Sequence, residues 1–325
     1  MPRPLLARAL AVIVLLAGGA VSAEELRPWE WRGSFGGEFG STSHGTFDLG
    51  VRRGPFVIEL LSDTLEVRWA PESATGRWWV ALRGEAIAAG LMISPWTNGK
   101  PDPSRDLYAG YLGGDAGWIH YVSPLYLGVH GMLREYFFAG NSDTTIAVPD
   151  PATLATLEAV VGRYVPGFHV WMRGGVDVRP GAQTVLQPHL AGEATIRPEL
   201  ELAPAVELRA GWASGQDFIT LTRVGGLNPY VVPVAGAGWA EWWVQNYVAA
   251  RLGINWRGPR LELGALADVA IFDSGFHAGF AVRGGWHQGR YSLDAELGYA
   301  PWIARGPEVD RISFYLLAAM AWGKR

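Results

Sequence analysis

The fold is decided by the stretch Phe276-His277-Ala278-Gly279-Phe280-Ala281-Val282-Arg283-Gly284-Gly285-Trp286. Its large apolar side chains fall on even-numbered residues, whereas His277 and Arg283 fall on odd-numbered ones. Successive side chains of a β-strand point to opposite faces. The alternation therefore predicts a strand with one apolar face and one polar or small face.

The same alternation recurs on both sides of this stretch. It covers residues 261–271, 291–299 and 312–322. Each run has about 9 to 11 residues, whereas strands of soluble sheets most often have about 5 or 6. A tilted strand needs about 9 to 11 residues to cross a bilayer. The runs therefore predict transmembrane strands.

Aromatic residues lie near the ends of these strands. That placement is typical of the aromatic girdles of a membrane barrel, which mark its two interfaces with water. The predicted interface aromatics are Trp256, Trp286, Tyr291, Tyr299, Trp302 and Trp322.

Weaker alternation continues towards the N-terminus and brings the total to about 16 strands, an even number as in closed bacterial barrels. Three of the predicted strands are short, and if they do not span, the barrel has about 12 or 14. The fold class is thus an all-β, transmembrane antiparallel β-barrel of about 12–16 strands. The additional predicted strands cover 29–41, 44–52, 55–62, 64–70, 77–89, 107–120, 125–138, 168–178, 189–202, 206–213, 218–223 and 242–256.

Three tight turns share one predicted side of the barrel. They are Arg52–Pro55, Trp256–Arg260 and His287–Arg290. If the last strand descends to the periplasm, counting strands puts all three on the periplasmic side. Short periplasmic turns are the rule in such barrels.

The composition agrees with a membrane barrel. Charged residues make up 18% of the chain, which also holds 43 Gly, 16 Trp and no Cys. No apolar stretch after residue 23 approaches the length of about 18 residues that a membrane-spanning helix needs. A net charge of −4 argues against a nucleic-acid partner.

The N-terminus resembles a secretory signal peptide. Arg3 and Arg8 give a positive region, an apolar run follows, and Val21-Ser22-Ala23 fits the cleavage rule. We expect a signal peptide over 1–23 and a barrel domain over 24–325. The predicted location is the outer membrane of a Gram-negative bacterium, with membrane lipid and the barrel-assembly machinery as partners during biogenesis.

Two long loops are expected at the opposite, extracellular side, over residues 90–106 and 139–166. The second contains a predicted short helix, because Asp150 can cap it and Pro151 suits its first position. Its apolar residues would share one face. The helix could fold into the lumen as a plug or lie over the mouth of the barrel.

Motifs for chemistry are sparse. The seven His residues show no metal-ligand spacing, so no metal site and no cofactor are predicted. No Gly-x-Ser-x-Gly elbow occurs. Asp273, Ser274 and His277 are adjacent in sequence, but Asp-Ser-Gly is ordinary turn chemistry. We therefore expect a protein that is not an enzyme and has no catalytic residues.

Charged residues on the predicted polar faces are candidates to line the lumen, because charge facing lipid is costly. Both signs are mixed, which favours a salt-bridged network; a selectivity lining for small solutes is the alternative. The lumen candidates are Arg197, Glu199, Glu201, Glu207, Arg209, Arg251, Glu262, Asp268, Arg283, Asp294 and Glu296.

From about Gly225 to Trp322 the chain resembles the barrel end of the bacterial surface-antigen (BamA-like) superfamily. The resemblance rests on these stretches: Gly225-Gly226, Gln245-Asn246-Tyr247, Ile271-Phe272-Asp273-Ser274-Gly275 and Gly298-Tyr299-Ala300-Pro301. Asp273 and Gly275 match a hairpin motif of that family, but the paired V/I-R-G-F/Y motif is missing, because Val282-Arg283-Gly284-Gly285 lies on a predicted strand. We also expect none of the family's periplasmic domains ahead of the barrel. The resemblance implies sixteen strands and does not extend to barrel assembly or secretion.

Four functions remain open from the sequence. A channel or transport-type barrel with a polar, mixed-charge lumen is favoured. A structural or assembly-type barrel that acts through partners is the alternative. A lipid-modifying enzyme would have to use Ser274 and His277. A soluble periplasmic β-protein is disfavoured, because its outward apolar faces would form a large exposed patch.

Overall fold

The computed structural model describes residues 29–321, except 40–43, 62–63, 74, 86–90, 94–95, 98–99, 102–103, 105, 141–144, 146, 182–183, 216–218, 226, 228–231, 238–241, 274 and 303–311. The predicted signal peptide, residues 1–23, lies outside this part of the chain. Within it the chain forms strands and no α-helix. No helix among the described residues is long and apolar enough to span a membrane.

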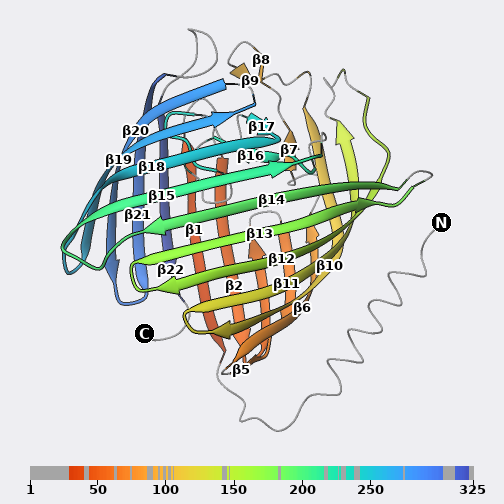
Figure 1. The fold of residues 1–325 in the computed structure, drawn as a ribbon, viewed down its shortest axis with the longest axis horizontal. Coiled ribbons are helices and arrows are strands. Elements are labelled where there is room, and N and C mark those ends of the chain that lie inside the picture. Colours follow the sequence, from red (N-terminus) through yellow and green to blue (C-terminus); the bar gives the residue numbers. More distant parts are fainter. Residues whose placement is uncertain are drawn as a thin grey trace.

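Sixteen antiparallel strands form a closed barrel (Figure 1). Each wall strand pairs with the next one along the chain, and β1 pairs with β22 from Gly33↔Met320 to Phe39↔Phe314 to close the circle. Closure removes the unpaired edges that a lipid environment cannot satisfy. The wall strands are β1 (Glu30–Phe39), β2 (His44–Arg53), β3 (Phe56–Leu61), β4 (Thr64–Trp69), β6 (Gly76–Glu85), β10 (Leu107–Val122), β11 (Leu125–Gly140), β12 (Ala152–Val165), β13 (Phe168–Arg179), β14 (Val185–Ile196), β15 (Leu202–Ala213), β18 (Asn246–Arg257), β19 (Leu261–Phe272), β20 (Gly275–Gln288), β21 (Tyr291–Trp302) and β22 (Ile312–Met320).

Shorter strands complete the fold. Two of them pair with wall strands, β5 (Glu72–Ser73) with β6 and β7 (Leu91–Ile93) with β10. Two small separate sheets are formed by β8 (Trp96–Thr97) with β9 (Lys100–Pro101), and by β16 (Thr222–Val224) with β17 (Trp242–Val244).

The predicted helix in the loop over 139–166 is wrong, because residues 152–165 form the wall strand β12. Leu154, Leu157, Val160 and Val161 share one face of a helix, but an alternating pattern fits the same residues. Leu157 and Val161 point outwards, whereas Leu154 is buried on the inner face. Pairing with β11 and β13 satisfies the backbone of β12, so tertiary context overrides the helical pattern.

The predicted count of sixteen is confirmed, but the membership differs from the prediction. The described residues of the predicted strand over 218–223, which are 219–223, contribute no wall strand, and its place in the count is taken by β12. The predicted strand over 189–202 ends at Ile196, and the next one begins at Leu202. The strand predicted wrongly over 218–223 and the unpredicted strand β12 therefore cancel in the strand count.

The barrel wall has an apolar outer face. Phe280, Leu157 and Phe35 point away from the lumen and are 58%, 62% and 74% exposed. Water would not favour so continuous an apolar surface, whereas the hydrocarbon of a bilayer would. The inner face carries the charged side chains described below.

The two rims of the barrel differ. β1 begins and β22 ends at one rim, which we call the terminal rim. The three predicted tight turns lie there, and two of them contain Gly54 (φ 56°) and Gly289 (φ 58°) in left-handed conformations. The connection between β15 and β18 leaves the opposite rim.

Candidate functional site in the lumen

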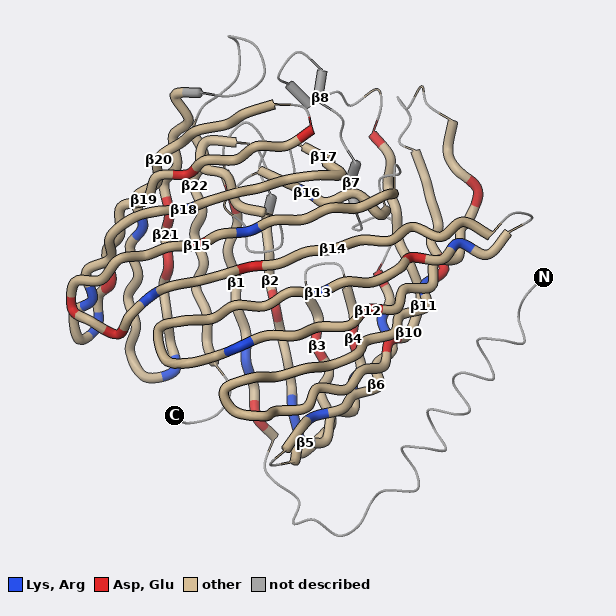
Figure 2. The backbone as a smooth tube through the Cα atoms, in the orientation of Figure 1, with Lys and Arg blue, Asp and Glu red and all other residues tan. Residues whose placement is uncertain are grey.

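The wall from β1 to β14 carries a line of ion pairs on its inner face, which we call the ionic chain. Acidic and basic side chains alternate along it, so that each base lies between two acids. Figure 2 shows such charged residues within the strands as well as in the turns. The order of the ionic chain is Asp48, Arg32, Glu59, Arg68, Glu66, Arg83, Asp115, His130, Glu158, His189 and Asp177.

In the first arc of the ionic chain, from Asp48 to Arg83, the bases are guanidinium groups. Arg32 lies 3.2 Å from Asp48 and 2.9 Å from Glu59, and Arg68 lies 3.3 Å from Glu59. The carboxylate of Glu66 is almost fully buried and would be costly without partners. Arg68 and Arg83 both contact it. Pairing thus allows these charges to occupy a restricted lumen.

A second set of ion pairs lines the wall from β14 to β21. Eight of the predicted lumen residues lie on inner faces there: Glu207, Arg209, Arg251, Glu262, Asp268, Arg283, Asp294 and Glu296. Arg251 is central, because its Nε lies 2.9 Å from Asp268 and its other end contacts Glu296. Arg197 lies just beyond β14 and reaches Glu207 from the turn.

The predicted placement of Glu199 and Glu201 on a strand face is wrong. Both lie in the turn between β14 and β15 at the terminal rim, and both are exposed. Pro198 precedes Glu199 and lacks a backbone donor for the ladder, which fits the end of the strand at Ile196. Glu201 accepts a hydrogen bond from Trp256 Nε1 at 3.3 Å.

The connection between β15 and β18 turns into the lumen. We call its described residues, 214–215, 219–225, 227, 232–237 and 242–245, the inserted segment. Residues 232–237 are all buried. Val224, Val234 and Trp242 contribute to an apolar cluster that also includes Tyr247 of β18 and Phe272 of β19. Packing against the wall therefore holds the inserted segment inside the barrel.

Three polar wall side chains fasten the inserted segment. The carboxylate of Asp268 accepts the N–H of Ala235 at 2.9 Å, and Ser313 Oγ accepts the N–H of Gly236 at 2.8 Å. His277 Nε2 lies 3.0 Å from the carbonyl of Ala235, which can only accept, so Nε2 carries the hydrogen. These bonds satisfy backbone groups that are buried away from water.

Two glycines of the wall permit this close approach. A Cβ at Gly279 would lie 2.7 Å from the carbonyl oxygen of Ala235. A Cβ at Gly298 would lie 2.8 Å from the nitrogen of Gly236. Neither this contact nor the ionic chain was predicted from the sequence. A signal for the ionic chain was available, since its members other than Glu158 fall within predicted strands.

The predicted hairpin residues Asp273 and Gly275 lie between β19 and β20. Asp273 accepts hydrogen bonds from the backbone N–H of Gln245 and Asn246 at 2.6 and 3.0 Å, and from Asn246 Nδ2 at 2.7 Å. Partial burial raises the pKa of Asp273, but the bonds from Asn246 and Gln245 outweigh it and hold the pKa below its ordinary value. Gly275 has φ 146°. Asp273 thus ties this hairpin to the start of β18.

A lipid-modifying enzyme would use Ser274 and His277, and Ser274 lies outside the described residues. His277 is fully buried beneath the inserted segment and in edge contact with Trp242. Among the described residues, no group of three or more His, Asp or Glu side chains is arranged so that it could hold a metal ion.

Four of the predicted interface aromatics lie on the outer face and are partly exposed: Trp256, Trp286, Tyr291 and Tyr299. Trp302 ends β21, and Trp322 lies outside the described residues. Tyr291 lies at the terminal rim, where Arg290 donates a hydrogen bond to its hydroxyl at 3.2 Å.

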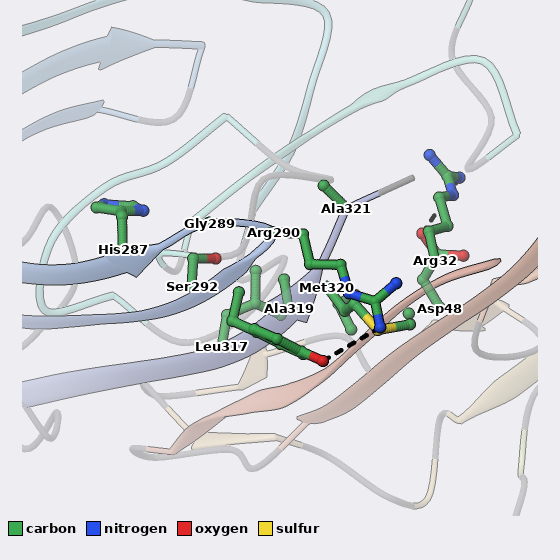
Figure 3. Close-up of a pocket in the computed structure, with 13 residues that line it drawn as sticks. Arg32, Asp48, His287, Gly289, Arg290, Ser292, Leu317, Ala319, Met320 and Ala321 are labelled. Atoms are coloured by element: carbon green, nitrogen blue, oxygen red, sulfur yellow. Dashed lines mark hydrogen bonds and ion pairs between the residues drawn. The ribbon is translucent and has the colours of Figure 1, made fainter. Parts of the chain in front are cut away.

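A cavity of about 370 Å³ opens beside the closure strands (Figure 3). Its lining includes Arg32 and Asp48 of the ionic chain together with His287, Arg290 and Ser292. The ionic chain therefore begins at a cavity near the terminal rim.

Comparison with known proteins places this geometry in a known fold. CdiB from Acinetobacter baumannii matches with a TM-score of 0.58 at 13% identity, over 91% of this chain and 60% of that chain. BamA from Haemophilus ducreyi lacking POTRA domains 1–3 matches with a TM-score of 0.60 at 11% identity, over 89% of this chain and 70% of that chain. No family model and no curated protein matches the sequence.

The chain is an outer-membrane-type β-barrel similar in structure to BamA and CdiB. The predicted resemblance to the BamA-like superfamily is confirmed at the level of the fold. The chain spans 60% of the length of the CdiB chain.

Proposed function

We propose that the protein resides in the outer membrane of a Gram-negative bacterium, exported by its signal peptide, and forms a path for small hydrophilic solutes. The observation that carries the proposal is the opposition of the two faces of the wall. Apolar side chains face outwards, whereas ion-paired side chains face a lumen. A bilayer favours the first face, and water and small polar solutes favour the second.

The path would follow the wall that the inserted segment does not cover. The inserted segment is fastened through Asp268, His277 and Ser313, on β19, β20 and β22. The side chain of Arg173 on β13 is 49% exposed, and that of His130 on β11 is 23% exposed. Water can therefore reach the inner face of β11 to β13. The inserted segment narrows the lumen from the other side.

The test has two stages. Cell fractionation and heat-modifiable gel mobility should place a folded barrel in the outer membrane. The purified protein should then give single-channel steps in a planar bilayer. A soluble periplasmic protein would refute the membrane proposal, and a membrane barrel without conductance would refute the channel. The role is proposed to be non-enzymatic. Any lipid hydrolysis detected with the purified protein should therefore be unchanged in the Ser274→Ala, His277→Ala variant.

A second candidate is an assembly-type barrel that acts through a protein partner. The similarity in fold to BamA favours it. Crosslinking in cells followed by affinity purification should then recover one periplasmic or lipoprotein partner in repeated preparations. Consistent absence of such a partner, together with clear conductance, would leave the channel.

A further inference from the structure

The bases of the ionic chain change type along its course. Guanidinium groups occupy the first arc, and imidazoles occupy the second. His130 lies 3.7 Å from Asp115 and 3.7 Å from Glu158, through its two ring nitrogens. His189 Nε2 lies 2.9 Å from Glu158, and its Nδ1 lies 3.2 Å from Asp177. We call these five residues the imidazole arc.

Each imidazole of the arc therefore faces a carboxylate on both sides. A neutral imidazole donates from one nitrogen and presents a lone pair at the other. That lone pair would face a carboxylate oxygen and repel it. Only the protonated ring matches both neighbours, so His130 and His189 serve in this geometry as cations, in the positions that Arg32, Arg68 and Arg83 hold in the first arc.

Neighbouring side chains of the wall contact the carboxylates of the imidazole arc, and two of these neighbours, Arg83 and Arg173, are charged. Arg83 of β6 lies 3.0 Å from Asp115, to which Trp79 of the same strand also donates at 2.9 Å. Arg173 of β13 lies 3.9 Å from Glu158, and Thr156 of β12 donates to Asp177 at 2.5 Å.

A glycine makes room for the central contact of the arc. A Cβ at Gly175 would lie 2.5 Å from the carbonyl oxygen of Leu157, 2.8 Å from Cγ of Glu158 and 2.8 Å from His189 Nε2. Any larger side chain at this position would press on the backbone of β12 as well as on the pair. Glycine thus leaves room both for the strand pairing and for the contact between Glu158 and His189.

The imidazole arc holds three carboxylates, and two guanidinium groups, those of Arg83 and Arg173, contact it. Once the imidazoles lose their protons, these two positive charges no longer balance the three negative ones. We propose that the imidazole arc is the charge-selectivity site of the lumen, and that it selects small inorganic cations when its two imidazoles are neutral. With both imidazoles protonated the arc is near balance and passes either sign. With both neutral it presents excess carboxylate to the open side of the lumen and favours cations. The inference rests on the proposed channel function.

The experiment measures the reversal potential of the channel in a KCl gradient. Neutral glutamine at both positions, His130→Gln with His189→Gln, should raise the ratio of potassium to chloride permeability about threefold near pH 7, an order-of-magnitude expectation for lumen charge. Raising the pH should move the wild type in the same direction, because the imidazoles lose charge. Lysine at both positions should keep the ratio low and remove the pH dependence.

A matched control is His120→Gln. His120 lies on β10, the strand of Asp115, but stacks on Trp118 on the outer face. It should leave the permeability ratio unchanged. Asp177→Asn gives the opposite test, since it should lower the preference for potassium even if the glutamine variant fails to fold.

The outcomes separate the two proposals. Conductance with a ratio that neither the His130 and His189 variants nor Asp177→Asn changes would overturn the selectivity site and leave the channel. A folded wild-type barrel without conductance would overturn both. Folding of each variant is checked by its heat-modifiable mobility.

Discussion

Alanine at Gly279 is expected to release the inserted segment from the wall. The new Cβ would lie 2.7 Å from the carbonyl oxygen of Ala235, whereas ordinary contact begins at 3.4 Å. The backbone at Ala235 would therefore have to recede by about 0.7 Å, because a β-carbon on a paired strand has little freedom to move.

That displacement acts on two hydrogen bonds at once. The N–H of Ala235 lies 2.9 Å from Asp268, and its carbonyl lies 3.0 Å from His277. Both distances would exceed the normal range for hydrogen bonds. A buried group left without its partner costs about 1–3 kcal/mol, and overpacking costs a similar amount. We expect a loss of about 2–5 kcal/mol in docking free energy, or at least about a 30-fold rise in the undocked fraction.

Limited trypsin digestion of the detergent-folded protein measures this fraction, because Arg223 lies in the inserted segment. The rate of cleavage after Arg223 should rise by a factor of about 30 or more, since cleavage follows the population of the open form. Gly131→Ala is the control, because the nearest heavy atom to its new Cβ would be 4.0 Å away. Equal cleavage rates in the two variants would show that the docking contact does not hold the segment.

Further expectations concern the wall and the hairpin. Phe280→Arg should destabilise the barrel in lipid vesicles by about 2–4 kcal/mol, as for cations on a lipid-facing surface, measured by urea titration. Leu157→Arg should do the same whereas Val160→Arg should be tolerated, and equal effects would contradict the strand assignment of β12. The depressed pKa of Asp273 stabilises its hairpin above the ordinary pKa of about 4, and this contribution is lost as the pH falls through the lowered value; Asp273→Asn should lack it at every pH, measured by hydrogen exchange. Ser313→Ala should speed trypsin cleavage less than Gly279→Ala, because it removes a single bond.

The wall of the barrel could be predicted because one face of each strand faces lipid and the other faces the lumen. Phe276, Phe280 and Val282 face outwards. Because lipid favours apolar side chains, such residues recur at every second position of the sequence. The prediction failed at β12, where the same residues satisfy periods of two and of 3.6. Periodicity alone cannot decide such a stretch.

The interior of the lumen could be predicted only in part. Alternation tells which face Asp115 or His130 occupies, but the pairing of side chains depends on strand stagger and tilt. The docking of the inserted segment joins residues 33, 42 and 77 positions apart in the chain. No local pattern in the sequence encodes contacts of that range.

The placement of charge has a consequence for assembly errors. Most lipid-facing positions carry interchangeable apolar side chains, so a neighbour that slips by two residues keeps its apolar surface outside. The lumen does not tolerate that slip. Arg251 stands directly opposite Glu207 on one side and Asp268 on the other, and Arg283 stands opposite Glu296. A slip of two would bring Arg251 opposite Ala205 or Arg209 instead of Glu207, and opposite Leu266 or Ala270 instead of Asp268. The charged residues of the lumen therefore specify a strand register that the outer surface of the wall specifies only weakly.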